Sequence, residues 1–145
     1  MTRNTPRTPT ILVVEDDASV RTWIQQVLLE HGYVSLGVGD AQEAIKAFEQ
    51  EDVEVYLAII DMILPGDAGL DLAAELGRRQ PGLRVLYISG CVDSIAMEAI
   101  AWNSPDLVLL KPFSEETLIE RIRWLMAKPA AMQSAGGGLG VSKSA

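Results

Sequence analysis

Tyr56-Leu-Ala-Ile-Ile-Asp-Met-Ile-Leu-Pro-Gly-Asp-Ala-Gly-Leu70 joins an apolar run to a single carboxylate and then to a turn. The run from Tyr56 to Ile60 has the length and composition of a strand that is buried on both faces. It ends on Asp61, and a Pro-Gly pair follows at residues 65 and 66. A carboxylate at the end of a core strand is costly to desolvate unless another group compensates its charge. The rest of the chain must therefore supply that group.

The composition is that of one folded, acidic domain. The chain has 145 residues, of which 48% are hydrophobic and 22% charged, and its net charge is −8. This charge argues against a nucleic-acid partner, which would require a basic patch. We expect no membrane association, because no apolar run is long enough to span a bilayer and the N-terminus lacks the apolar core of a signal peptide. With Cys91 as its single cysteine, the chain can form no internal disulfide, so a cytoplasmic location is expected.

Three regions differ in composition along the chain. Residues 1–9 are rich in Thr, Pro and Arg and are typical of a flexible leader. Residues 129–145 are rich in Gly and Ala and are typical of a flexible tail. The folded domain is therefore predicted to cover residues 10–128.

Within this domain, strand patterns alternate with helix patterns. The apolar runs predict strands over residues 11–14, 33–38, 55–60, 83–88 and 106–110. Helical spacing and capping residues predict helices over 18–31, 40–51, 69–80, 93–102 and 114–128. This alternation predicts an α/β fold, a doubly wound parallel sheet of five strands with five helices on its two faces.

Polar side chains directly follow several of the predicted strands. Glu15 and Asp16 follow the first strand, Asp61 the third, Ser89 the fourth and Lys111 the fifth. The carboxyl ends of parallel strands meet at one edge of the sheet, where ligands bind in such folds. We therefore expect these side chains to lie close together. Asp17 is expected to be the cap of the first helix rather than a member of the group.

This group of residue types indicates phosphoryl chemistry supported by Mg²⁺. Crowded carboxylates repel one another unless a cation joins them, and oxygen ligands of this kind suit Mg²⁺. Asp61 could then stay ionised and act as a nucleophile towards phosphorus. Metal held by Asp16, the Lys111 ammonium and the Ser89 hydroxyl would stabilise the developing phosphoryl charge. Mg²⁺ and Lys111 are thus the predicted compensation for the buried Asp61.

The same residues resemble those of bacterial response-regulator receiver domains. The resemblance covers about residues 10–128 and rests on four motifs at predicted strand ends. They are Ile11-Leu-Val-Val-Glu-Asp-Asp17, Asp61 with Leu64-Pro-Gly-Asp-Ala-Gly-Leu70, Tyr87-Ile-Ser-Gly90 and Lys111-Pro-Phe113. It implies the fold of the chemotaxis response regulator, with strand order 2-1-3-4-5.

The resemblance also implies a role for each metal-site residue. Asp16 and Asp61 would be direct Mg²⁺ ligands, and Glu15 would hold a metal-bound water. The backbone carbonyl of Ile63 would complete the protein's share of the coordination.

The resemblance further implies how the phosphoryl group is received. Asp61 would accept it from a histidine kinase or a histidine phosphotransfer protein. Ser89 would bond a phosphoryl oxygen, Lys111 would pair with its charge, and a cis peptide bond would precede Pro112. Such a domain is a phosphoacceptor rather than an enzyme, with at most slow self-catalysed phosphorylation and dephosphorylation.

Signal output is less well defined by the sequence. The resemblance implies altered contacts with a downstream protein, and in many relatives phosphorylation also drives formation of a homodimer. The family often places an aromatic switch residue three positions before the lysine, where this chain has Val108. The Ile-Ser-Gly and Leu-Pro-Gly stretches look most like receivers found with hybrid histidine kinases. The chain is then either a stand-alone receiver or a fragment of a longer protein.

Three other functions compete with the receiver interpretation. A phosphatase of the haloacid dehalogenase type needs a second aspartate two residues after the nucleophile, where this chain has Ile63. A flavodoxin-like carrier would need Ser, Thr and Gly in its first loop, where Glu15-Asp16-Asp17 stands. A receiver-like binding module that works without phosphorylation would not need the complete set of Asp16, Asp61, Ser89 and Lys111.

Overall fold

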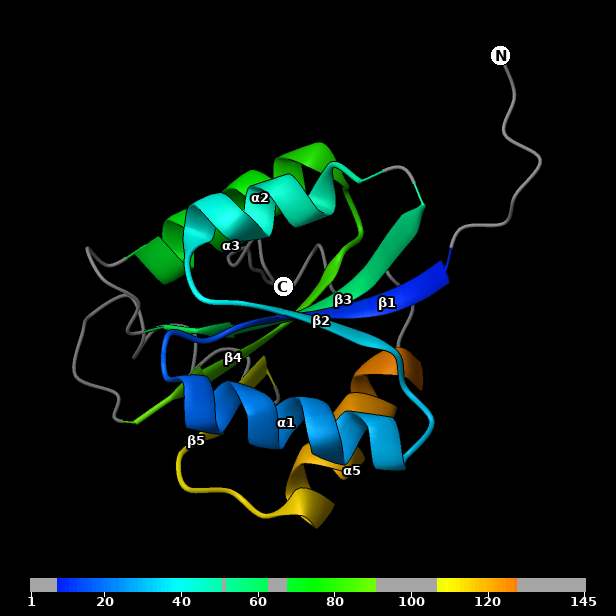
Figure 1. Ribbon diagram of the computed structural model, residues 1–145, viewed down its shortest axis with the longest axis vertical. Coiled ribbons are helices and arrows are strands. Elements are labelled where there is room, and N and C mark those ends of the chain that lie inside the picture. Colours follow the sequence, from blue (N-terminus) through cyan, green and yellow to red (C-terminus); the bar gives the residue numbers. More distant parts are fainter. Residues whose placement is uncertain (1–7, 51, 63–67, 91–106, 128–145) are drawn as a thin grey trace, which may run out of the picture.

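The structure, a computed structural model, contains a five-stranded parallel sheet in the order β2-β1-β3-β4-β5 (Figure 1). It describes residues 8–50, 52–62, 68–90 and 107–127. The strands are β1 (Thr8–Val14), β2 (Ser35–Val38), β3 (Val53–Asp61), β4 (Arg84–Ser89) and β5 (Val108–Leu110). The predicted fold class and strand order are confirmed.

Helices cover both faces of this sheet. They are α1 (Ala18–Glu30), α2 (Ala41–Phe48), α3 (Ala68–Arg79) and α5 (Glu115–Ala127). Helices α1 and α5 lie on one face, and α2 and α3 lie on the other (Figure 1). The helix expected over residues 93–102 lies outside the described residues. None of the helices in the described ranges is long and apolar enough to cross a membrane.

Continuous apolar strands follow from this double covering. Successive side chains of a strand point to opposite faces of the sheet. When helices cover both faces, the odd-numbered and the even-numbered residues of the strand must both be apolar. Along β1, Ile11 and Val13 are buried with α1 and α5. Leu12 and Val14 are buried with residues of α2 and α3. All four side chains are fully buried, so β1 lies at the centre of the fold.

The helix ends lie close to where the capping residues predict them. Asp17 accepts hydrogen bonds from the backbone N–H groups of Ser19 and Val20, which confirms it as the cap of α1. The carboxylate of Asp40 caps α2 in the same way. Gly32, two residues after the end of α1, has φ +87°, a conformation in which glycine avoids the cost of a Cβ atom.

Several element boundaries differ by a few residues from the sequence expectation, and two differences change where residues lie. Strand β1 begins at Thr8 rather than at residue 11, so Thr8 and Pro9, predicted as part of the leader, pair with Val53 and Glu54 of β3. Trp23 falls at the apolar helical spacing of Ile24 and Val27, which are buried, but it is 39% exposed. Its ring packs instead against Phe113, with 5.7 Å between ring centroids.

The start of α3 packs directly on the end of β3. A Cβ atom on Gly69 would lie 2.8 Å from the carbonyl oxygen of Asp61 and 3.0 Å from the Cα of Met62. Both are backbone atoms, which cannot move away as a flexible side chain would. The absence of a side chain at Gly69 therefore allows α3 to approach the strand end that carries Asp61.

We predict opposite effects of alanine at the two glycines of α3. Gly69→Ala should lower the free energy of unfolding by about 1–3 kcal/mol, because the added methyl group overpacks a rigid backbone contact. Gly77→Ala should raise it by about 0.5–1 kcal/mol, because nothing lies within 4 Å of its Cβ position and alanine is the better helix former. Urea unfolding of both variants measures this. Shifts of the same sign would contradict the assigned contact.

Candidate functional site

The carboxyl ends of the strands bring the predicted polar residues together. Glu15 directly follows β1, Asp61 ends β3, Ser89 ends β4 and Lys111 directly follows β5. Glu15, Asp61 and Ser89 are buried, and Lys111 is partly buried. The parallel pairing continues past the strand ends, since the N–H of Lys111 donates to the carbonyl oxygen of Ser89 at 2.8 Å. The Lys111–Pro112 peptide bond is cis, as predicted.

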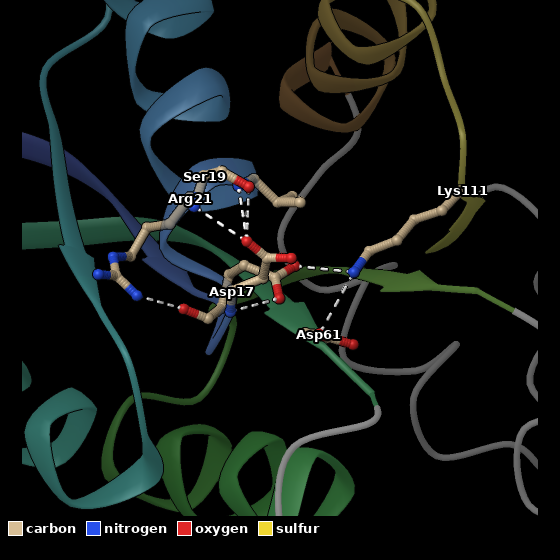
Figure 2. A network of polar contacts seen from close by, with 7 residues as sticks. Asp17, Ser19, Arg21, Asp61 and Lys111 are labelled. Carbon is tan, nitrogen blue, oxygen red and sulfur yellow. Dashed lines mark hydrogen bonds and ion pairs between the residues drawn. The ribbon is translucent and has the colours of Figure 1, made fainter.

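The Lys111 ammonium joins the two buried carboxylates. Its Nζ lies 3.0 Å from Glu15 Oε1 and 3.4 Å from Asp61 Oδ2. Figure 2 shows the Lys111 side chain extended across the site towards Asp61. Burial lowers the pKa of Lys111, but the ion contact with Glu15 and the charge of Asp61 outweigh burial and raise the pKa above its ordinary value. Lys111 is therefore a fixed positive charge between two carboxylates.

Glu15 is held in an environment that disfavours its charge. Burial, followed by the hydrogen bond to Asp61, raises the pKa of Glu15 from 4.5 to about 7, although Lys111 and the Asp17 N–H act in the opposite direction. Its Oε2 accepts a hydrogen bond from the Asp17 N–H at 3.1 Å. Its Oε1 is buried and makes no hydrogen bond of good geometry, so its compensation is the ion pair with Lys111. Glu15 thus has unused capacity to accept a ligand or a cation.

Three carboxylates form a cluster that fits a hard cation. One oxygen each from Glu15, Asp16 and Asp61 lies within 4.8 Å of the others. Asp16 is exposed, whereas Glu15 and Asp61 are buried, so the cluster opens towards solvent on the side of Asp16. Oxygen donors of this number, with one open side, suit Mg²⁺ with bound water. Ile63, the predicted carbonyl ligand, lies outside the described residues.

Arg21 is a site residue that sequence reasoning missed. It is the fourth residue of α1, and its Nη1 donates a hydrogen bond to the backbone carbonyl oxygen of Glu15 at 2.7 Å (Figure 2). A bond to a main-chain atom requires no particular residue type at the acceptor. The one available signal was the place of an arginine shortly after the acidic loop.

Val108 occupies the position where the family often has an aromatic switch residue, and its side chain is buried. It packs in a small cluster with Met62, Leu70 and Tyr87. Tyr87 is the direct neighbour of Val108 in the register of β4 and β5. An aromatic side chain is therefore present at this place, but it comes from the adjacent strand.

The sequence and the fold both match known proteins. The sequence profile of the response regulator receiver domain matches residues 11–123. The DNA-binding response regulator MtrA of Mycolicibacterium paratuberculosis is 29% identical over 113 residues, which cover 78% of this chain and 49% of the relative. The two-component response regulator PhoP of Pseudomonas aeruginosa is 34% identical over 119 residues, covering 81% of this chain and 52% of the relative. The chain thus spans about half the length of these curated relatives.

A solved structure supports the fold independently of the sequence profile. The CheY-like receiver domain protein of Methanospirillum hungatei JF-1 superposes with a TM-score of 0.69 at 22% identity, covering 92% of this chain and 99% of that one. The family profile covers most of the chain. The chain belongs to the response-regulator receiver domain family.

Proposed function

We propose that Asp61 is the residue on which this receiver domain accepts a phosphoryl group, in a reaction that depends on Mg²⁺. Acceptance of a phosphoryl group on aspartate is general for receiver domains. The observation that carries the assignment is the position of Lys111 Nζ, 3.4 Å from Asp61 Oδ2 at the edge where the three carboxylates gather. A nucleophilic carboxylate beside a fixed cation is the arrangement that phosphoryl transfer needs.

The donor is proposed to be a phosphohistidine of a histidine kinase or a histidine phosphotransfer protein. A carboxylate oxygen of Asp61 forms the new bond to phosphorus while the bond between phosphorus and the donor's imidazole nitrogen breaks. The electron pair of the broken bond stays on the imidazole nitrogen. Lys111 pairs with the charge of the transferred group, and the Ser89 hydroxyl donates a hydrogen bond to one of its oxygens.

The metal-binding role is proposed for the acidic edge. Asp16 and Asp61 would be direct ligands together with the backbone carbonyl of Ile63, and Glu15 would hold a metal-bound water. The spacing of the three carboxylates supports this set, as does the buried Glu15 Oε1, whose one assigned contact is the ion pair with Lys111. Mg²⁺, when bound, would supply positive charge to the phosphoryl oxygens during transfer.

The output is proposed to be a change in protein contacts. The phosphorylated domain would bind a downstream protein or a second copy of itself differently from the unphosphorylated domain. Two of the relatives are named as DNA-binding or two-component response regulators, and this chain covers only about half of each. The net charge of −8 of the whole chain favours protein partners over nucleic acid.

We predict that the chain acquires one phosphoryl group when it is incubated with Mg²⁺ and a small phosphodonor, measured by intact-mass spectrometry. Asp61→Asn should abolish the adduct, because the amide lacks the nucleophilic oxygen. Asp40→Asn is the matched control. Asp40 follows β2 at the same edge of the sheet, but its carboxylate caps α2, and asparagine is an equally good cap.

Two outcomes would contradict the assignment. A phosphoryl adduct that persists in Asp61→Asn would move the acceptor to another residue. A folded wild-type protein that gains no adduct would favour the alternative function, a receiver-like module that binds partners without phosphorylation.

We also predict that Mg²⁺ affinity rises with pH. The folded-state pKa of Glu15 is raised, so the stability that this group contributes to the metal-free protein is present below about pH 4.5 and is lost as the pH rises through about 7. A cation must displace the same proton, so Mg²⁺ should bind about tenfold more weakly at pH 6 than at pH 8. Calorimetric titration at both pH values measures the ratio. In Glu15→Gln the ratio of Mg²⁺ affinity at pH 8 to that at pH 6 should be much smaller. An equally small ratio in the wild type would contradict the titration of Glu15 as the cause of the pH dependence.

A further inference from the structure

We propose that Arg21 is a positioning residue that orients the acidic loop between β1 and α1 for metal binding. This inference rests on the proposed function, because it concerns the same Mg²⁺ site. The guanidinium does not lie among the metal-binding carboxylates. It acts on the main chain that carries them, through its 2.7 Å hydrogen bond to the carbonyl oxygen of Glu15.

The bond fixes the peptide unit between Glu15 and Asp16. The preceding peptide unit is also held, because the Glu15 N–H donates to the Val38 carbonyl oxygen at 3.1 Å. Among the described residues, no hydrogen bond is found for the Asp16 carboxylate, which is exposed. The orientation of this carboxylate therefore depends on the backbone of Asp16. Arg21 fixes the peptide unit that precedes the Cα atom of Asp16, through its bond to the Glu15 carbonyl oxygen. An outer contact of this kind orients a ligand without touching the metal.

The backbone of Arg21 is itself anchored to the loop. Its N–H donates to the Asp17 carbonyl oxygen at 2.9 Å, in the first turn of α1. A Cβ atom on Gly39, which follows β2, would lie 3.4 Å from Arg21 Nη1. The guanidinium thus lies near the ends of both β1 and β2, and its side chain connects α1 to the acidic loop (Figure 2).

Charge and positioning predict opposite results when Arg21 is removed. Arg21 is a cation near a cation-binding cluster, so a role through charge alone would repel Mg²⁺, and removal would tighten binding. A positioning role predicts that removal weakens binding, because the loop must then be ordered when the metal binds. The sign of the change in affinity therefore separates the two roles.

The experiment is calorimetric titration of the full chain with Mg²⁺, at a temperature where circular dichroism shows every variant to be folded. Arg21→Met, which keeps the aliphatic stem, should weaken Mg²⁺ binding about tenfold, the lower end of the range for outer-shell partners of metal ligands. Arg21→Lys keeps the charge without the planar fork and should fall between Arg21→Met and the wild type. The amide resonance of Asp17 should shift in both variants before any Mg²⁺ is added.

Arg84→Met is the matched control for the loss of an arginine–carbonyl bond. Arg84 Nε donates to the carbonyl oxygen of Leu125 at 3.0 Å, at the opposite end of β4 from Ser89. The change should lower stability but leave the Mg²⁺ affinity within about twofold of the wild type. A general loss of stability would move both variants equally.

The outcomes separate this proposal from the proposed function. If Mg²⁺ binding is lost in Asp16→Asn but Arg21→Met binds as tightly as the wild type, or more tightly, the positioning role of Arg21 is wrong and the metal site stands. If Mg²⁺ binding survives in Asp16→Asn, the metal site of the proposed function is wrong, and the role of Arg21 fails with it.

Discussion

The ion contact of Lys111 with Glu15 and Asp61 is the constraint on which the site depends. Two carboxylates are buried at the end of a parallel sheet, and burying a charged group is costly unless another group compensates its charge. The ammonium lies 3.0 Å from one and 3.4 Å from the other, and it is supplied by the strand that is last in both sequence and sheet order. Burial still raises the pKa of Glu15 to about 7, so Lys111 compensates the charge of this carboxylate only in part. A divalent cation would compensate the remaining negative charge of the carboxylates.

The fold meets this constraint through backbone register rather than through flexible side chains. Strand pairing places Asp61 beside Ile88 and Ser89 beside Leu110. The polar residues at the ends of β3, β4 and β5 therefore lie at the same height along the sheet. The hydrogen bonds from Met62 to Ile88 and from Lys111 to Ser89 extend this level beyond the sheet. Helix α3 packs closely at Gly69 against the backbone of Asp61 and Met62 at the end of β3. These main-chain contacts fix the positions from which the side chains of Asp61, Ser89 and Lys111 extend into the site.

This distinction also explains which features the sequence could predict. Period and turn chemistry located the strands and the described helices, and strand ends located Glu15, Asp16, Asp61, Ser89 and Lys111 at one edge. Features that depend on contacts with main-chain atoms leave no pattern in the sequence. Examples are the hydrogen bond of Arg21 to the Glu15 carbonyl oxygen and the pairing of Thr8 and Pro9 with β3, despite the loop-like composition of residues 1–9. Trp23 fitted the apolar stripe of α1, yet its packing partner, Phe113, is 90 residues away in the chain. Tyr87 beside Val108 likewise depends on strand register, which sequence periodicity alone does not give.

The most direct test of the account is a carbon-13 NMR titration of the Glu15 side-chain carboxyl in the metal-free protein, in the wild type and in Lys111→Met. If the Lys111 ammonium balances the buried carboxylates, Glu15 should titrate with a pKa of about 7 in the wild type. Without the ammonium that pKa should rise further, by about one to three units, the range for loss of an adjacent opposite charge. A wild-type Glu15 that titrates at its ordinary value of 4.5, or one that Lys111→Met leaves unchanged, would contradict the central role of this contact.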